Sequence, residues 1–348
     1  MEVSLGRAIA LIIVFLAIVI SYAEIVKNMK ERGLVQQGDP QVEGLEKGVI
    51  KLDNKQQPFY LYTNNKNADE RRPAILVLQG SGVSAVNMRE AGFDDLADRE
   101  NLSIIYVPLS TPSWLLNAAI EGENTSAAFD VDTVNFVHQM LEELIVNVRL
   151  DPSRIFLTGF SDGGVATFYF MCELSHLVAA VATVSASMPV ELIEDCSPER
   201  PIPLLMLNGT ADKRVRFSGG IFGDPNRPQG LEMASAFDTA TFWREANNCK
   251  QEDEKAVLDD VAPDDQVRVW TQIWKDCPDG AVIQFVTLLG GAHGWPGADL
   301  PMPTKQDPDM VLPKATSDID GAEFIWSFFE GKALPPSQPD LPADTATP

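Results

Sequence analysis

The stretch Ile155–Val165, which reads IFLTGFSDGGV, decides how the rest of the chain is interpreted. It opens with apolar residues typical of a buried strand and runs on through Gly159, Ser161, Gly163 and Gly164. Glycines two residues either side of the serine leave room for a strained turn that lifts its side chain clear of a sheet. A bare G-x-S-x-G also arises by chance, so the alternative is a serine among glycines. The strand before it and the helix after it favour a nucleophilic Ser161.

Seven further apolar runs resemble the one that precedes Ser161. Several carry β-branched residues at successive positions, as expected for parallel strands that are covered on both faces. Together the runs predict strands at 48–52, 59–63, 74–80, 102–108, 155–159, 179–187, 203–209 and 282–291. Helical periodicity marks Val131–Val148, and a capping box at Ser317–Asp320 predicts a last helix that ends at Gly331. The alternation predicts an α/β fold, a mostly parallel central sheet with helices on both faces.

A serine nucleophile needs a base, and the chain has three histidines. His138 lies inside the predicted helix Val131–Val148, which favours a solvent-side or packing role. His176 is expected at the end of the helix after Ser161, where a histidine interacts favourably with the helix dipole. His293 stands in GGAHGWPG directly after the last strand, and strand ends are where α/β folds keep their sites. By elimination, His293 is the predicted base.

The acid that would orient His293 is expected between the serine and the histidine if the chain order is serine, acid, histidine. Asp212 ends the run PIPLLMLNGTAD, three residues past Gly209, at the carboxyl end of a predicted strand. Its role would be to hold the histidine ring and to stabilise the imidazolium. Asp195 and Glu199 are weaker candidates because no strand positions them. The carboxylates in the polar stretch 250–265 are interpreted as solvated surface.

Composition limits the partners of the protein. The 348 residues carry a formal net charge of -23, which argues against nucleic acid and anionic membrane surfaces as partners. The chain is expected to divide into a leader at 1–23, a polar spacer at 24–45, a catalytic domain at 46–331 and a proline-rich disordered tail at 332–348.

The leader contains an unbroken apolar run, Ala8–Ala23. Its length suits the core of a signal peptide, and residues 21–23 form an acceptable cleavage site. The alternative is an uncleaved anchor, although the run is short for a membrane-spanning helix of roughly 20 residues. Both interpretations place the rest of the chain outside the cytoplasm, as a secreted or periplasmic protein with membrane attachment only through residues 8–23.

The four cysteines fit an exported protein. Cys172, Cys196, Cys249 and Cys277 lack the C-x-x-C spacing of a zinc site or a redox pair. Export favours disulfides, and four buried thiols are the alternative. Four cysteines allow three pairings, of which the sequential one closes loops of moderate size.

Three motifs together resemble a known group of enzymes. DPSRIFLTGFSDGG, PIPLLMLNGTAD and GGAHGWPG are similar to the secreted polyhydroxybutyrate depolymerase, feruloyl esterase and acetylxylan esterase group of the α/β hydrolases. The resemblance covers about Gly48–Gly331. It implies the α/β-hydrolase fold, with Ser161, Asp212 and His293 as a catalytic triad.

The resemblance also implies the disulfides Cys172–Cys196 and Cys249–Cys277, because cysteines of this group are placed similarly. One departure concerns the loop after the third strand, where the group usually has Leu-His-Gly and this chain has Gln79 in the middle position. That loop supplies a backbone N–H to the oxyanion hole. We predict Ser81 as this donor and Asp162, the residue after the nucleophile, as the second donor.

The sequence thus predicts an exported serine esterase that hydrolyses esters of hydroxyalkanoate oligomers, or acyl and feruloyl esters of polysaccharides. Segments 110–130 and 214–229 are expected to wall the substrate site, and the first of these keeps little of the group's pattern. No metal or cofactor is implied by the residues. The alternatives are a serine peptidase on the same fold and a non-catalytic binding protein with a relic triad.

Overall fold

The computed structural model describes residues 44–52, 55–64, 70–80, 82–108, 131–222, 231–253, 255–304 and 307–335. The expected leader, most of the spacer, most of the tail and the whole of segment 110–130 therefore lie outside the described residues, as do residues 223–229 of the second expected wall segment. Within the described ranges, no helix is long and apolar enough to cross a membrane.

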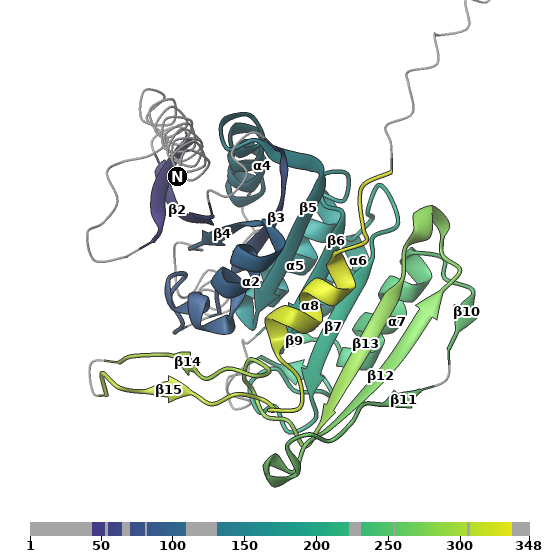
Figure 1. Cartoon of the computed structure of the whole chain (residues 1–348). Helices are drawn as coiled ribbons and strands as arrows, with labels where there is room; N and C mark the ends of the chain where they lie inside the picture. Colours follow the sequence, from purple (N-terminus) through teal and green to yellow (C-terminus); the bar gives the residue numbers. More distant parts are fainter. Residues whose placement is uncertain are drawn as a thin grey trace, which may run out of the picture.

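A large central sheet organises the described residues (Figure 1). Its eleven strands follow the order β1–β2–β4–β3–β5–β6–β7–β13–β12–β10, with β11 also paired to β12. The six central strands β4, β3, β5, β6, β7 and β13 are parallel, and the pairings at either edge are antiparallel. The bounds are β1 Glu46–Leu52, β2 Lys55–Thr63, β3 Arg72–Leu78, β4 Ser103–Val107, β5 Leu150–Phe160, β6 Ala180–Val184, β7 Leu204–Gly209, β10 Gln251–Glu252, β11 Ala256–Val257, β12 Arg268–Lys275 and β13 Ile283–Leu289.

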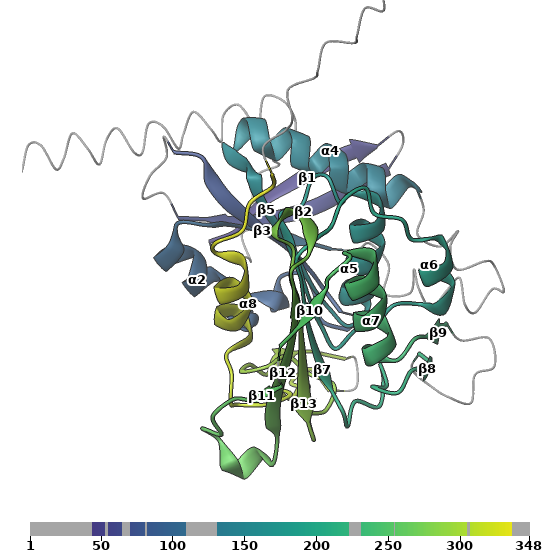
Figure 2. The same cartoon turned by 90° about the vertical axis from the view of Figure 1, so that its right-hand side faces the viewer.

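Helices cover both faces of this sheet, as the sequence predicted (Figure 2). On one face lie α2 Phe93–Glu100 and α8 Gly321–Phe329, and on the other lie α4 Val131–Asn147, α5 Asp162–Glu173, α6 Val190–Asp195 and α7 Ala236–Ala246. The remaining elements are short: η1 Asn87–Ala91, η3 Pro263–Asp265, η4 Pro278–Gly280, and the strand pairs β8 Gly220–Ile221 with β9 Glu232–Met233 and β14 Leu300–Pro301 with β15 Val311–Leu312.

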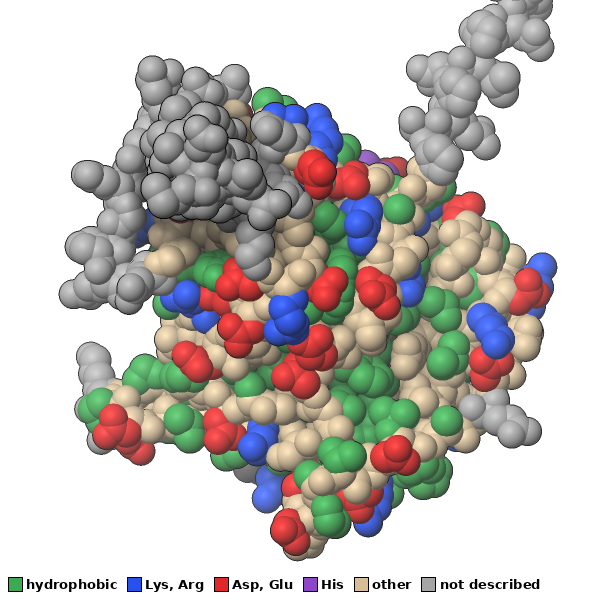
Figure 3. Space-filling model, in the orientation of Figure 1, with side chains coloured by type: hydrophobic (Ala, Val, Ile, Leu, Met, Phe, Trp, Pro, Cys, Tyr) green, Lys and Arg blue, Asp and Glu red, His purple; other side chains and the backbone are tan. Residues whose placement is uncertain are grey.

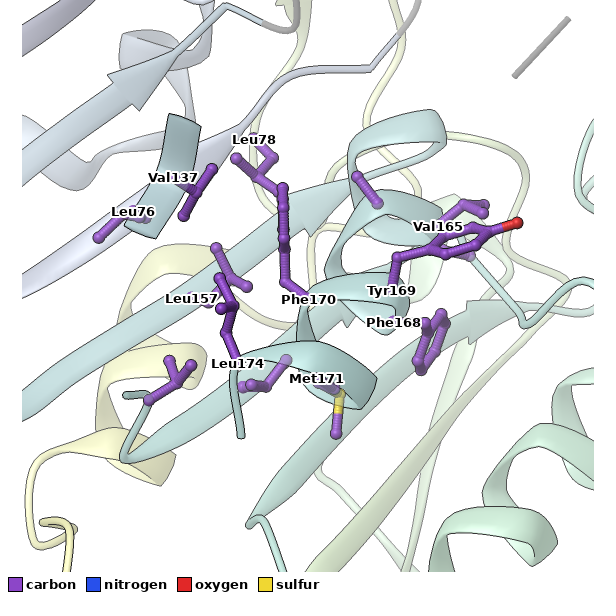
Figure 4. Packing of buried hydrophobic residues seen from close by; sticks show 14 of the residues in the cluster. Leu76, Leu78, Val137, Leu157, Val165, Phe168, Tyr169, Phe170, Met171 and Leu174 are labelled. Atoms are coloured by element: carbon purple, nitrogen blue, oxygen red, sulfur yellow. The ribbon is translucent and has the colours of Figure 1, made fainter. Parts of the chain in front are cut away.

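Helix α5 is the most deeply buried helix and lies against the middle of the sheet. Every residue from 162 to 172 is buried. Phe170 points toward Leu78 of β3 and Leu157 of β5, and Val137 of α4 closes the same cluster (Figure 4). Burying one such side chain contributes about 1.5–3 kcal/mol, so contacts all round α5 hold its first turn in place.

The eight predicted strands are all present, but β12 was not predicted. Residues 250–265, which the sequence suggested were only solvated surface, contain β10 and β11, and both pair with β12. Their side chains are exposed nonetheless. Strand β12 has buried Val269 and Trp274 but leaves Trp270 41% exposed. Such mixed burial is typical of a strand near a sheet edge. The strand therefore lacks the continuous apolar run by which the central strands were predicted.

The last helix begins later than predicted. Its N-cap is Asp320, whose Oδ1 accepts a hydrogen bond from the Glu323 N–H at 3.0 Å. Asp318, which we expected in the first turn, instead accepts from the backbone N–H groups of residues 261–262, each at 2.9 Å. The predicted start at Ser317 is wrong because this tertiary contact keeps the preceding segment out of the helix.

Two disulfides join elements on the α5 side of the fold. Cys172–Cys196 connects the end of α5 to the residue after α6, and Cys249–Cys277 connects the turn after α7 to the turn after β12. This is the pairing that the resemblance implied, and no free thiol is left.

Charged side chains are interspersed on the face shown in Figure 3. Acidic and basic groups alternate over short distances there, and no broad area of one sign is visible. On this face the charged residues therefore lie on a solvated surface of mixed sign.

We expect the two disulfides to stabilise the fold by similar amounts. Their sequence separations of 24 and 28 residues close loops of similar length, and the chain-entropy model gives on the order of 3 kcal/mol for each. Urea unfolding of the double variants C172A/C196A and C249A/C277A should show comparable losses. Peptide mapping without reduction should recover both linked pairs, and recovery of free thiols would contradict the pairing.

Candidate active site

Ser161 occupies a strained turn between β5 and α5. Its backbone has φ 54° and ψ −119°, a region that L-residues rarely adopt. Its N–H donates to Val184 O at 2.9 Å, which ties the turn to the end of β6. The residue is only 1% exposed. An unusual conformation held in this way by the surrounding strands is typical of a functional residue.

The turn requires glycine on both sides of Ser161. A Cβ on Gly159 would lie 2.2 Å from Gly163 O, and a Cβ on Gly163 would lie 2.4 Å from both Leu78 O and Gln79 O. All these contacts are with backbone atoms, so no change of side-chain rotamer would relieve them. The first turn of α5 therefore lies directly against the end of β3.

Asp212 lies three residues past the end of β7, and both of its carboxylate oxygens are engaged. Oδ1 accepts from the Arg214 N–H at 2.8 Å and from the Val215 N–H at 2.9 Å. Oδ2 lies 2.7 Å from His293 Nδ1. The side chains of Asp212 and His293 are 1% and 7% exposed. A buried carboxylate is costly without partners, and these three donors compensate it.

The loops that carry these two residues pack backbone to backbone. Strands β7 and β13 are parallel neighbours, so their carboxyl ends meet at one edge of the sheet. The Ala211 N–H donates to Gly291 O at 2.9 Å, and a Cβ on Gly209 would lie 2.3 Å from the same oxygen. This close approach holds Asp212 and His293 in register with each other.

His293 also lies beside the turn that carries Ser161. Its ring centroid is 5.2 Å from that of Phe160, the residue before the serine, and Ser185 Oγ donates to Gly294 O at 3.3 Å. Ser161 Oγ and His293 Nε2 are both buried and make no hydrogen bond to any described residue. The two atoms are therefore not bonded to each other here. In enzymes without bound substrate, hydrogen bonds between catalytic residues are often long, and they shorten when the substrate binds.

Of the two predicted oxyanion donors, Asp162 lies among the described residues and Ser81 does not. Ser81 lies outside the described residues, but its neighbour Gly80 borders the serine, because a Cβ on Gly80 would lie 3.0 Å from Ser161 Cβ. Asp162 is the first residue of α5 and follows Ser161 directly. The loop after β3 and the start of α5 thus meet at Ser161.

The other two histidines lie together elsewhere on the surface. The ring centroids of His138 and His176 are 6.4 Å apart. Their side chains are 40% and 43% exposed and lie 3.6 and 3.5 Å from Glu142 and Glu199. His176 does not end α5, which stops at Glu173, so that expectation is wrong by three residues. Both histidines therefore lie beside exposed glutamates and not beside Ser161.

The weaker acid candidates do not contact His293. Asp195 is exposed at the end of α6, and Glu199 faces His176. Among the described residues, no group of three or more His, Cys, Asp or Glu side chains could hold a metal ion.

An apolar groove of about 310 Å³ lies against β12 and β13. Its hydrophobic lining residues are Phe217, Phe237, Trp270, Phe285 and Leu289. Strand β13 continues into the loop that carries His293, but none of the three predicted catalytic residues lines the groove.

The comparison with solved structures identifies the fold. A structure described as that of a thermostable esterase has a TM-score of 0.50 and 15% sequence identity, over 84% of this chain and 64% of that one. The chain has an α/β-hydrolase fold. No protein-family model matches it.

Proteins whose sequences are similar to this chain are named esterases. It is 28% identical over 242 residues to "Putative esterase NocK" of Nocardia uniformis subsp. tsuyamanensis, a match to 67% of this chain and 68% of that protein. It is 27% identical over 166 residues to feruloyl esterase B of Piromyces equi, a match to 47% of this chain and only 29% of that protein. These relatives confirm the resemblance to the esterase group that the three motifs indicated.

A buried aromatic cluster that the sequence did not predict packs beside His293. The Phe160 ring lies 6.2 Å from Trp295, which in turn lies 5.7 Å from Phe93. Trp295 is fully buried, two residues past His293. The tryptophan in GGAHGWPG could have indicated this cluster, because a large aromatic residue in a glycine-rich loop needs a buried site.

Gly163→Ala should unfold or strongly destabilise the protein, by about 2 kcal/mol or more, because the new Cβ meets two backbone carbonyls. Gly331→Ala is the matched control, since a Cβ there meets nothing within 4 Å. Thermal unfolding of both variants measures the difference. Equal midpoints would show that the start of α5 can move away from β3.

Proposed function

We propose that the protein is an exported serine esterase whose catalytic domain spans 46–331 and whose triad is Ser161, Asp212 and His293. The observation that carries the proposal is the buried 2.7 Å contact between His293 Nδ1 and Asp212 Oδ2, beside a serine held in a strained turn. The names of the relatives support the same class of reaction.

In the proposed first half-reaction, Ser161 Oγ attacks the ester carbonyl carbon while His293 Nε2 takes the hydroxyl proton. The imidazolium that forms is stabilised by Asp212, which accepts a hydrogen bond from Nδ1–H. The tetrahedral intermediate then collapses and the C–O bond to the alcohol breaks. His293 returns the proton to the leaving alkoxide, and an acyl-enzyme remains.

In the second half-reaction, water attacks the acyl carbon and His293 accepts its proton. Collapse of the new intermediate releases the carboxylic acid and returns the proton to Ser161. The negative charge on the carbonyl oxygen develops next to the start of α5, where the Asp162 N–H is the proposed donor. The N–H of Ser81 is the second proposed donor, because its neighbour Gly80 lies against Ser161.

The proposed substrates are acyl or feruloyl esters of polysaccharides, or esters of hydroxyalkanoate oligomers. The relative from Piromyces equi is named a feruloyl esterase, which supports the first class. A panel of soluble acetyl, feruloyl and hydroxybutyryl esters, run beside peptide amides, tests the assignment. Turnover of the peptides in preference to every ester would make the protein a peptidase.

The two disulfides support the export part of the proposal. Disulfides persist in oxidising compartments and are rare in the cytosol. Four cysteines that are all paired therefore favour a periplasmic or extracellular protein. Fractionation of the native host tests this location.

Ser161→Ala should lower kcat by on the order of 10⁴-fold or more, because the covalent step loses its nucleophile. Labelling by a fluorophosphonate should disappear with it. Ser187→Ala is the matched control: this serine is also fully buried, its Oγ makes no hydrogen bond to the described residues, and it should keep both activity and labelling. Labelling of the Ser161→Ala variant at the wild-type level would contradict the proposal.

Asp212→Asn should lower kcat by about 10⁴-fold while the fold is retained. The amide oxygen would replace Oδ1 and keep the bonds from Arg214 N–H and Val215 N–H. The amide NH2 would then face His293 Nδ1 and place the ring proton on Nε2, the wrong tautomer for a base. The exposed Asp195→Asn is the control. Wild-type kcat in Asp212→Asn would remove Asp212 from the triad.

A further inference from the structure

The hairpin β14–β15 starts and ends at the loop that carries His293. Its two ends close on each other next to the histidine: the Ala315 N–H donates to Trp295 O at 3.1 Å, and the Lys314 N–H donates to Asp299 Oδ1 at 2.8 Å. A Cβ on Gly294 would lie 2.2 Å from Pro313 O, so the base of the hairpin packs directly on the residue after His293.

The first strand of the hairpin reaches the loop after β3. The side chain of Met302 covers Gly82, and a Cβ on Gly82 would lie 2.9 Å from both Cγ and Sδ of the methionine. Asn87 Nδ2 donates to Pro301 O at 3.0 Å, which fixes the same strand against η1. Figure 1 shows the hairpin projecting from the body of the protein at the lower left, and Figure 3 shows the same projection in space-filling form.

The loop under Met302 borders the serine. Gly82 has φ +87°, a conformation that favours glycine, and the next N–H, from Val83, donates to Gly80 O at 3.1 Å. A Cβ on Gly80 would lie 3.0 Å from both Phe160 O and Ser161 Cβ. The described contacts therefore link Met302 to Gly82, the Val83 N–H to Gly80, and Gly80 to Ser161.

We propose that Met302 is a positioning residue for the esterase reaction, which holds the backbone around Gly80 and Gly82 against the serine turn. The inference rests on the proposed function. In this role, Met302 acts through the loop and not on the reacting atoms. Loss of its side chain leaves a gap over Gly82, so the loop shifts and stabilises the developing oxyanion less well. Removing one oxyanion donor costs about 10²–10³-fold in kcat, and a displaced donor costs part of that.

The test compares Met302→Ala, Met302→Leu and Val311→Ala in the full-length protein with a soluble acetyl ester. We expect Met302→Ala to lower kcat about 10- to 100-fold, as a fraction of the donor effect, with KM nearly unchanged. Met302→Leu should restore most of kcat, because leucine fills a similar volume. Val311, 48% exposed on the other strand of the hairpin, is the matched control and should keep kcat.

Two further variants distinguish a loss of positioning from misfolding of the Met302→Ala protein. Asn87→Ala removes only the hydrogen bond to Pro301 O and should give a smaller loss of kcat with the same unchanged KM. Gly82→Ala tests whether residues 82 and 302 act together. Its Cβ would collide with the Met302 side chain, and this collision is absent when Met302 is also replaced by alanine. The loss from Gly82→Ala should therefore shrink in the double variant.

Several outcomes overturn the positioning role. They are wild-type kcat in Met302→Ala, a raised KM with unchanged kcat, or a loss in Val311→Ala as large as that in Met302→Ala. If Ser161→Ala is inactive while Met302→Ala is normal, the positioning role alone fails. If the wild-type protein cleaves no ester, or if Ser161→Ala keeps its activity, the proposed function fails and the positioning role fails with it.

Discussion

The close approach of the first turn of α5 to the end of β3 is the constraint on which the candidate site depends. It requires that Gly163 carry no side chain, because its α-carbon faces the carbonyl oxygens of Leu78 and Gln79. The contact sets the position of α5 on the sheet and leaves Ser161 no ordinary backbone conformation. It also brings the loop after β3 to the serine, so one backbone contact places the residue and its surroundings together.

The second half of the site is organised by a single buried charge. The Asp212 carboxylate accepts hydrogen bonds from two backbone N–H groups of its own loop. It also contacts the ring of His293, which lies in the loop after the neighbouring strand. Removing one of these partners would leave the buried carboxylate with one hydrogen bond fewer, which costs about 1–3 kcal/mol or more for a charged group. The electrostatic requirement and the packing of the β7 and β13 loops therefore act in the same direction, and both favour one geometry.

The sequence predicted the central strands because each is a short run of apolar residues bounded by turn residues. It failed at β12, which is partly exposed, and at Ser317, where the N-cap depends on what Asp318 binds across the fold. Motif order and strand ends brought Asp212 and His293 together correctly. The contact of Met302 with Gly82 could not be predicted, because it joins segments 220 residues apart in the chain through no pattern in either segment.

The short strands at one edge of the sheet bear on how the protein behaves at high concentration. An open strand edge presents unpaired N–H and C=O groups to which other chains can add, a route to aggregation. On its outer side, β12 is paired by β10 and β11, each only two residues long. Their charged and polar neighbours in 250–265 are mostly exposed. This edge of the folded protein therefore offers other copies of the chain no long ladder to extend, which disfavours self-association through it.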